Sequence, residues 1–150
     1  MSSDRNRQLP GPKPWWNDGL RFSCQGSGKC CVSYGANHYV YVTLEDRRRL
    51  AAATKLPTRQ FTRKYCTKRD GLFHLVGYEG PCVFLDGRRC SVYEARPTQC
   101  RTWPFWPENM RAEKWDRVAT FCPGVGEGQV IPADEIREIL QKQRRSTDEL

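Results

Sequence analysis

The sequence has no long apolar run. None of its segments approaches the roughly 18 consecutive apolar residues that a membrane-spanning helix needs, and hydrophobic residues make up only 38% of the 150-residue chain. The N-terminal stretch, residues 1–19, also lacks the apolar region and the small-residue cleavage site of a secretory signal. We therefore expect a cytoplasmic protein with no membrane span.

Several signatures of catalysis and recognition are missing as well. No paired carboxylates, no Ser-His-Asp pattern and no phosphate-binding Walker loop can be placed along the chain, and "GSGK" at 26–29 is better explained as a turn between cysteines. The net charge is +8, but the basic residues are scattered and no nucleic-acid-binding motif accompanies them. These absences argue against a nucleic-acid partner, lean against an enzyme, and leave a protein partner of unknown identity.

Cysteine, by contrast, is abundant, with eight residues in the chain. In a reducing compartment, a dense cysteine pattern more often binds metal or takes part in catalysis than forms disulfides. Ten prolines and twelve glycines leave little room for long regular elements, so local cross-links would help a small core to fold. A metal site is therefore the primary expectation; structural disulfides and free or redox-sensing thiols are the alternatives.

Seven of the cysteines form three groups, each next to glycines or prolines that allow the chain to turn around a ligand. The groups are Cys24 with Cys30 and Cys31; Cys82, Cys90 and Cys100; and Cys122. Thiolates are soft donors that favour zinc, copper(I) or iron–sulfur clusters. Because a zinc ion or an iron–sulfur cluster takes about four such ligands, seven thiols suggest either two metals that share a thiolate or one four-cysteine site with spare thiols.

Two arginines, Arg96 and Arg101, flank Cys100 within "RPTQCR". Their guanidinium groups could form a second shell that hydrogen-bonds the thiolates and lowers their pKa. The alternative is a structural salt bridge to Glu94 or Asp86.

The remaining candidates have simpler explanations. We expect His38 and His74 to be non-ligands, because thiols are plentiful, and Cys66 to be buried in the core. We expect the block "TWPFWP", which is Thr102 followed by Trp103 to Pro107, to form an apolar lid that keeps water from the metal. A substrate pocket or a partner-docking surface is the alternative for this block.

The local patterns predict short elements. Thr43 and Asp46 resemble a capping box that opens a helix over 44–54, which ends before Pro57, and a second short helix follows over 58–66. Residues 37–44 and 72–78 have the composition of strands. Residues 82–93 predict a hairpin with a type I′ turn at Asp86-Gly87.

The second half of the chain adds two helical signals. Pro97 can occupy the first position of a helical turn that carries Cys100, and the acids and bases at the two ends of residues 132–145 predict the clearest helix. The fold class is therefore α+β: a small, loop-rich single domain with short helices and a β-hairpin around a cysteine metal site. We expect an extended N-terminal arm (1–19) docked by Trp15 and Trp16, a cysteine-cluster domain (20–128), and a C-terminal helix and tail (129–150).

Three blocks, "FSCQGSGKCC", "PCVFLDGRRCSVYEARPTQCRTWPF" and "FCPGVGEG", resemble the bacterial YkgJ-type cysteine-cluster proteins, described as a zinc- or iron-chelating domain. The resemblance spans Phe22 to Gly128. It implies zinc or iron, including an iron–sulfur cluster, as the cofactor, and assigns the metal ligands as Cys24, Cys30, Cys31, Cys82, Cys90, Cys100 and Cys122. One departure is Ser27, where many members have a further cysteine.

The resemblance leaves the biological role open. The cysteine cluster is distantly similar to that of flagellin N-methylase, so a cluster-dependent enzyme or accessory subunit in methyl transfer or redox chemistry is one alternative. The chain is short for a complete methyltransferase and shows no cofactor-binding βαβ pattern. A metal-delivery protein with labile thiolates is the other alternative to a metal-stapled domain that meets a partner.

Overall fold

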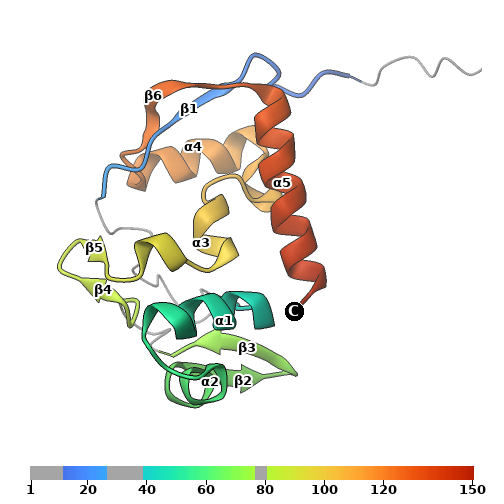
Figure 1. Ribbon diagram of the computed structural model, residues 1–150. Coiled ribbons are helices and arrows are strands. Elements are labelled where there is room, and N and C mark those ends of the chain that lie inside the picture. Colours follow the sequence, from blue (N-terminus) through green and yellow to red (C-terminus); the bar gives the residue numbers. More distant parts are fainter. Residues whose placement is uncertain (1–11, 27–38, 77–80) are drawn as a thin grey trace, which may run out of the picture.

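The computed structural model describes residues 12–26, 39–76 and 81–150 (Figure 1). Within these residues, the strands form three antiparallel pairs, β1 with β6, β2 with β3 and β4 with β5. The elements are β1 (Leu20–Phe22), α1 (Leu44–Ala53), α2 (Thr58–Tyr65), β2 (Cys66–Arg69), β3 (Leu72–Leu75), β4 (Leu85–Asp86), β5 (Arg89–Cys90), the 3-10 turn η2 (Tyr93–Ala95), α3 (Thr98–Thr102), the 3-10 turn η3 (Pro107–Asn109), α4 (Ala112–Phe121), β6 (Val125–Ile131) and α5 (Ala133–Asp148). The expected small α+β domain is confirmed.

The hydrophobic interior is divided into two clusters. The α1–α2 cluster joins these two helices to β3 and to the segment around the β4–β5 hairpin, and its buried members are Val42, Leu50, Ala51, Phe61, Leu75, Phe84, Val92 and Ala95. The α4–α5 cluster has the buried members Phe105, Trp115, Ile136 and Leu140. Figure 1 shows the same division, with α1, α2, β2 and β3 at the bottom, β1, β6 and α4 at the top, and α3 between them.

Helix α1 begins as predicted. The Thr43 hydroxyl accepts a hydrogen bond from the Asp46 backbone N–H, and the Asp46 carboxylate accepts one from the Thr43 N–H, both at 3.0 Å. This reciprocal pair satisfies two of the N–H groups that a helix start leaves unpaired. Asp46 also accepts hydrogen bonds from the N–H and hydroxyl of Thr98, at 3.0 and 2.8 Å, so the cap of α1 holds the start of α3.

The N-terminal arm docks on the body through its tryptophans, as predicted. The indole N–H of Trp15 donates to the Met110 carbonyl at 2.7 Å, and its ring lies 6.0 Å from that of Trp115. Residues 15–18 of the arm form a turn, and the Gly19 N–H bonds back to the Trp16 carbonyl. The two rings can thereby reach the α4–α5 cluster from one short stretch.

Two strand predictions are only partly correct. In 37–44, whose first two residues lie outside the described ones, pairing is limited to an isolated bridge between Tyr41 and His74. On the other edge of this segment, the Gln99 side chain accepts a hydrogen bond from the Tyr41 N–H and donates one to the Tyr39 carbonyl. A side chain therefore takes the hydrogen bonds that a neighbouring strand would otherwise form. In 72–78, β3 ends at Leu75, and residues 77 and 78 are not described.

The β4–β5 hairpin forms where predicted, but its turn is of another type. Asp86 pairs with Arg89, so the loop is Gly87-Arg88. A type I′ turn needs positive φ at both loop residues. Gly87 has φ +64°, but φ of Arg88 is not positive, because Lys55 and Asp70 are the described non-glycine residues with positive φ. Pro97 likewise lies at the N-cap of α3, one residue before the predicted position.

Helix α5 confirms the prediction over 132–145, with Pro132 as its N-cap. The sequence did not predict the strands β1, β2 and β6, the helix α4, or the two 3-10 turns η2 and η3. None of the helices among the described residues combines the length and apolar character that crossing a bilayer requires.

Candidate metal centre

Five of the seven predicted ligands lie in the described residues. Cys24 is exposed just after β1, and the other four are half-buried: Cys82 before β4, Cys90 in β5, Cys100 in α3 and Cys122 at the C-cap of α4. Cys30, Cys31 and His38 lie outside the described residues. Cys24, Cys90 and Cys122 carry free thiols, the state from which thiolate ligands form.

The structure brings the loop of Cys24 and the loop of Cys122 close together. The backbone N–H of Ser23, next to Cys24, donates to the carbonyl of Gly124 at 3.0 Å, and Gly124 is two residues beyond Cys122. The two backbones are so close that a Cβ on Gly124 would lie 2.5 Å from the Ser23 carbonyl oxygen. Only glycine allows this approach without a shift of the backbone.

The pairing of β1 with β6 places these two loops. Leu20 pairs with Ile131 and Arg21 with Val130, but Phe22 pairs with Val125, so the register shifts and the intervening part of β6 bulges. Gly126 and Gly128 in this bulge have φ +89° and +80°, a region that favours glycine. In Figure 1 the segment after β1 runs down the left side of the molecule, where the end of α4 and the β4–β5 hairpin also lie.

The middle group is anchored to the α1–α2 cluster. Cys82 and Cys90 both pack against this cluster, and Cys90 pairs across the hairpin with Leu85, whose N–H donates to the Cys82 carbonyl at 2.9 Å. The open end of the hairpin therefore holds two predicted ligands, Cys90 on β5 and Cys82 in the turn that leads into β4.

The arginines that flank Cys100 bond the backbone. Arg101 donates from Nε to the Arg96 carbonyl at 3.1 Å and from its terminal nitrogen to the Glu94 carbonyl. Arg96 donates from Nε to the Tyr93 carbonyl at 2.9 Å, and its guanidinium lies 3.8 Å from the centre of the Tyr93 ring. Neither forms an ion pair with Glu94 or Asp86, since the ion pairs of the described residues are Arg49–Asp46 and Arg137–Asp134. The salt-bridge alternative is therefore wrong, and Arg101 instead fastens η2 to α3.

The aromatic block after Cys100 fills the space between α3 and α4. Phe105 belongs to the α4–α5 cluster, and the ring of Trp103 lies 4.8 Å from that of Trp106 and 5.7 Å from that of Phe121, the residue before Cys122. The indole N–H of Trp103 is buried and has no hydrogen-bond partner. The block thus packs next to two predicted ligands, and its role as a lid over a metal stays a prediction.

His74 and Cys66 belong to the interior. His74 is 1% exposed, its Nδ1 lies 2.9 Å from the Leu75 carbonyl, and its ring packs against that of Tyr39 at 4.7 Å. Cys66 is half-buried against the α1–α2 cluster rather than fully buried. Burial raises the pKa of the Cys66 thiol from 9.0 to about 11, although the nearby Arg47 acts in the opposite direction.

The described residues do not form a complete metal site by themselves. Among residues 12–26, 39–76 and 81–150, no group of three or more His, Cys, Asp or Glu side chains could hold a metal ion. The donor set nonetheless fits zinc or iron, because every predicted ligand is a thiol and four of the five described ones are half-buried. The prediction that Cys30 and Cys31 are further ligands concerns residues outside the described ones.

The close contact between Ser23 and Gly124 was not foreseen from the sequence. The glycines and proline of "FCPGVGEG" predict a turn beside Cys122, but the pattern contains no partner for the turn. Three glycines in five residues, Gly124, Gly126 and Gly128, were the available signal, because a glycine cluster next to a ligand often marks a place where another backbone approaches.

Comparison with known families identifies the chain. Residues 23–123 match the family described as "CxxCxxCC: Putative zinc- or iron-chelating domain". The chain belongs to this family, which confirms the resemblance seen in its cysteine blocks. The pattern in the family's name aligns with residues 24–31, where Ser27 stands at the second of its four cysteines.

A curated relative gives the same picture without adding a function. The chain is similar to "Uncharacterized protein MJ0661" of Methanocaldococcus jannaschii, with 29% identity over 91 residues. The similarity covers 59% of this chain and 47% of the relative, so the chain spans about half the length of the curated relative that it matches. No solved structure matches.

Proposed function

We propose that this chain is a cytoplasmic metal-binding protein whose zinc or iron is held by thiolates from all three cysteine groups. Its metal-binding unit is residues 20–128, preceded by the docked arm of 1–19 and followed by the helix and tail of 129–150. The ligands are Cys24, Cys30, Cys31, Cys82, Cys90, Cys100 and Cys122.

The contact between Ser23 and Gly124 is the observation that carries this proposal. It places Cys24 and Cys122 on adjacent loops although they lie at opposite ends of the region that matches the family. The loops meet through backbone groups, and glycine is required at the contact. Such close backbone approach next to thiols is what a thiolate metal site needs.

The metal would also join the two halves of the interior. Cys82 and Cys90 pack against the α1–α2 cluster, whereas Cys24 follows Phe22 and Cys122 precedes Val125, both of which pack against the α4–α5 cluster. One ion or cluster with ligands from both sets would therefore cross-link two small cores. Metal-binding free energy becomes folding free energy in such an arrangement.

Ser27 limits the cluster that can form. A serine hydroxyl is a weak donor to a soft metal, so the first group offers three thiols where the family pattern has four. Three thiols from the first group and four from the others still exceed the needs of one tetrahedral ion. Two metals that share a thiolate, or one site with spare thiols, remain the two stoichiometries to separate.

Anaerobic purification followed by metal analysis tests the proposal. Iron with visible charge-transfer absorption identifies an iron–sulfur centre, whereas a colourless protein with stoichiometric zinc identifies a zinc site. A two-metal site gives about two zinc ions per chain, since each tetrahedral ion takes four ligands and one can be shared. Protein that holds neither metal after anaerobic preparation would contradict the proposal.

Substitution of single cysteines tests the ligand set. With two metals that share a thiolate, each of the seven, changed to serine, should lower the metal content; with one site and spare thiols, only the ligands of that site should do so. Cys66→Ser provides the matched control outside the set. Arg101→Ala tests whether this arginine supports the metal site. Loss of metal at unchanged secondary structure supports a role of Arg101 in positioning Cys100 through the η2–α3 contact. Equal metal content in Cys66→Ser and in all seven ligand variants would overturn the assignment.

A further inference from the structure

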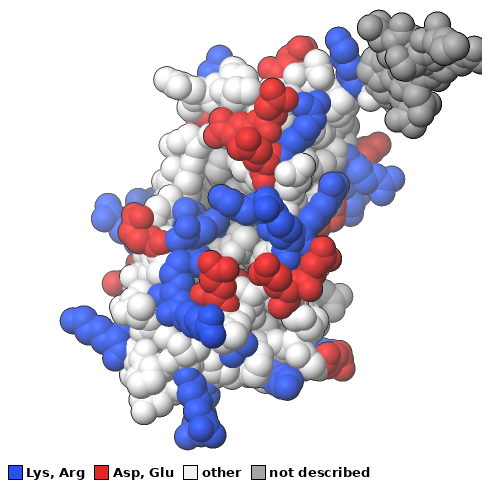
Figure 2. Space-filling view, turned by 45° about the vertical axis from the view of Figure 1, so that its right-hand side comes forward, with Lys and Arg blue, Asp and Glu red and all other residues white. Residues whose placement is uncertain are grey.

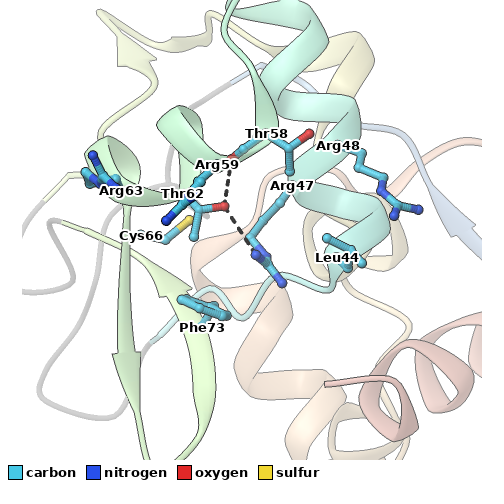
Figure 3. A pocket seen from close by; sticks show the side chains of 9 residues that line it. All are labelled: Leu44, Arg47, Arg48, Thr58, Arg59, Thr62, Arg63, Cys66 and Phe73. Carbon is cyan, nitrogen blue, oxygen red and sulfur yellow. Dashed lines mark hydrogen bonds between the residues drawn. The ribbon is translucent and has the colours of Figure 1, made fainter.

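An open pocket of about 570 Å³ lies beside helices α1 and α2, and none of its described lining residues is a cysteine of the proposed centre. Figure 3 shows its walls, which come from the two helices, the first residue of β2 and the ring of Phe73 on β3. The lining residues are Leu44, Arg47, Arg48, Thr58, Arg59, Thr62, Arg63, Cys66 and Phe73. Four of these nine are arginines and none is acidic.

The arginine charges of this pocket are not neutralised within the described residues. The two ion pairs there are Arg49–Asp46 and Arg137–Asp134, and neither includes an arginine of the pocket. Asp46, the buried acid of α1, is used by Arg49, Thr43 and Thr98. Over the face shown in Figure 2, acidic side chains lie among the basic ones, so a pocket with four arginines and no acid differs from the general surface.

Arg47 is held in place at the centre of the pocket. Its Nη1 donates to the Thr62 hydroxyl at 3.2 Å, and its guanidinium lies 4.2 Å from the centre of the Phe73 ring. Its Nε is buried and has no hydrogen-bond partner. A buried donor without a partner is costly, and a bound anion is one way in which this guanidinium could be satisfied.

The other three arginines surround this fixed group. In Figure 3, Arg48 and Arg63 lie at opposite edges of the pocket, and Arg59 projects from α2 beside Thr62. All three are exposed. Flexible guanidinium groups at the edge of a pocket can close around an anion, and the planar fork of arginine matches the oxygens of phosphate.

We propose that this pocket binds a small anion that carries two or more phosphate groups. A single carboxylate would leave most of the positive charge of four guanidinium groups unbalanced, whereas a diphosphate or triphosphate offers charge and oxygens for several of them. The Cys66 thiol adds no negative charge to oppose the ligand at neutral pH, because neutral pH lies far below its pKa, which burial raises to about 11. This proposal is independent of the metal centre.

Calorimetric titration of the full-length, metal-loaded protein tests it, with inorganic pyrophosphate, ADP and adenosine as probes. Pyrophosphate and ADP should bind and adenosine should not, because recognition rests on phosphate. If ADP binds tighter than pyrophosphate, the ligand is a nucleotide; equal affinities indicate that the phosphates alone are recognised. The metal content is measured again after each titration, so that extraction of metal by pyrophosphate is not mistaken for binding.

Two double variants with the same loss of charge separate the pocket from the general surface. Arg59→Gln with Arg63→Gln removes two exposed arginines of the pocket, and Arg144→Gln with Arg145→Gln removes two exposed arginines of α5. The first should weaken pyrophosphate binding by about a hundredfold, since each of the two lost charge-assisted contacts contributes roughly 1.5 kcal/mol, or about tenfold, and the second should leave it unchanged. These exposed positions are chosen because Arg47→Gln would also remove contacts that support the fold.

Three outcomes would overturn the proposal. Absence of binding at low ionic strength is one, and equal weakening in both double variants is another, because it indicates diffuse attraction. The third is binding of single-stranded RNA that both double variants weaken and that pyrophosphate does not compete with, which would assign the arginines to a nucleic-acid surface.

Discussion

The backbone N–H of Ser23 donates to the carbonyl of Gly124, and the two segments approach so closely that a methyl group on Gly124 would lie 2.5 Å from the Ser23 carbonyl oxygen. Each of these residues stands within two positions of a predicted ligand, Cys24 or Cys122. The contact thus fixes how far apart these two cysteine loops can be, whatever the metal.

Gly124→Ala should therefore separate the two loops. The new Cβ would meet the Ser23 backbone and the Phe22 ring, at 2.5 and 2.8 Å, and a buried contact of this kind cannot relax without moving one strand. We expect the free energy of unfolding to fall by about 1–3 kcal/mol and the metal content to fall with it. Urea denaturation and metal analysis of the purified variant measure the two effects.

Gly126→Ala is the matched control. Its Cβ would have nothing within 4 Å, but its φ of +89° disfavours alanine. It should lose about 1 kcal/mol of stability through backbone strain and keep its metal. If both variants retain metal equally, the Ser23–Gly124 contact does not position the ligands.

Asp46→Ala tests the link between α1 and the helix that carries Cys100. The Asp46 side chain is 1% exposed and accepts hydrogen bonds from Thr43, Arg49 and Thr98. Its loss leaves several buried donors without partners and should cost about 3 kcal/mol. Thermal and urea denaturation measure the change.

Asp134→Ala removes a comparable ion pair that is exposed. Asp134 pairs with Arg137 at the same 2.7 Å, but its side chain is 93% exposed. Exposed ion pairs contribute little, so no measurable change in stability is expected. Equal destabilisation by the two substitutions would show that the buried network around Asp46 has no special role.

The elements that were predicted correctly are those with local signals. Helix α1 has its capping box in four consecutive residues, and α5 has acids in its first turn and a basic residue in its last turn. By contrast, α4 has Arg111 as its N-cap, with no side-chain cap hydrogen bond, and buries only Trp115 and Val118. A helix with so few local markers depends on packing against the rest of the chain, which a single sequence does not reveal.

The sheet that positions the candidate site was missed for a related reason. β6 is rich in glycine, and its partner β1 has three residues and lies at the other end of the chain. The cysteines could be recognised from their type and their neighbouring turns, but the proximity of Cys24 and Cys122 depends on this non-local pairing. The arginine pocket is similarly non-local, because α1 and α2 each contribute only part of its charge.

The reactivity of Cys66 should depend on pH in a way that sets it apart from an exposed thiol. Burial raises its pKa from 9.0 to about 11, so the folded protein holds this proton more tightly than the unfolded chain does. Alkylation of Cys66 by iodoacetamide should be slow at pH 8 and should rise steeply towards pH 11, because the thiolate is the reactive form. Mass spectrometry of the Cys66 peptide follows the reaction.

The same peptide in urea is the control, and there the reaction should rise around pH 9. Because only the folded state has the raised pKa, the contribution of Cys66 to stability is present below pH 9 and decreases as the pH rises towards 11. Cys66→Ala should remove this part of the pH dependence. A reaction profile that is the same in folded and unfolded protein would contradict the burial of this thiol.

Removal of the metal should uncouple the two hydrophobic clusters. The two tryptophans that pack with the α4–α5 cluster, Trp16 and Trp115, have no counterpart among the residues of the α1–α2 cluster. Tryptophan fluorescence therefore follows one half of the molecule, whereas far-ultraviolet circular dichroism follows the helices of both.

With metal bound, the two probes should report one coincident urea transition. After chelation under reducing conditions, the midpoints of the two transitions should fall and separate. The proposed metal joins Cys82 and Cys90, which pack on the α1–α2 cluster, to the loops of Cys24 and Cys122 beside the α4–α5 cluster, so its removal takes away this cross-link. Restoring zinc or iron should bring the transitions together again. Coincident transitions in the metal-free protein at an unchanged midpoint would mean that the contacts of α3 alone hold the two clusters together and that the metal has no structural role.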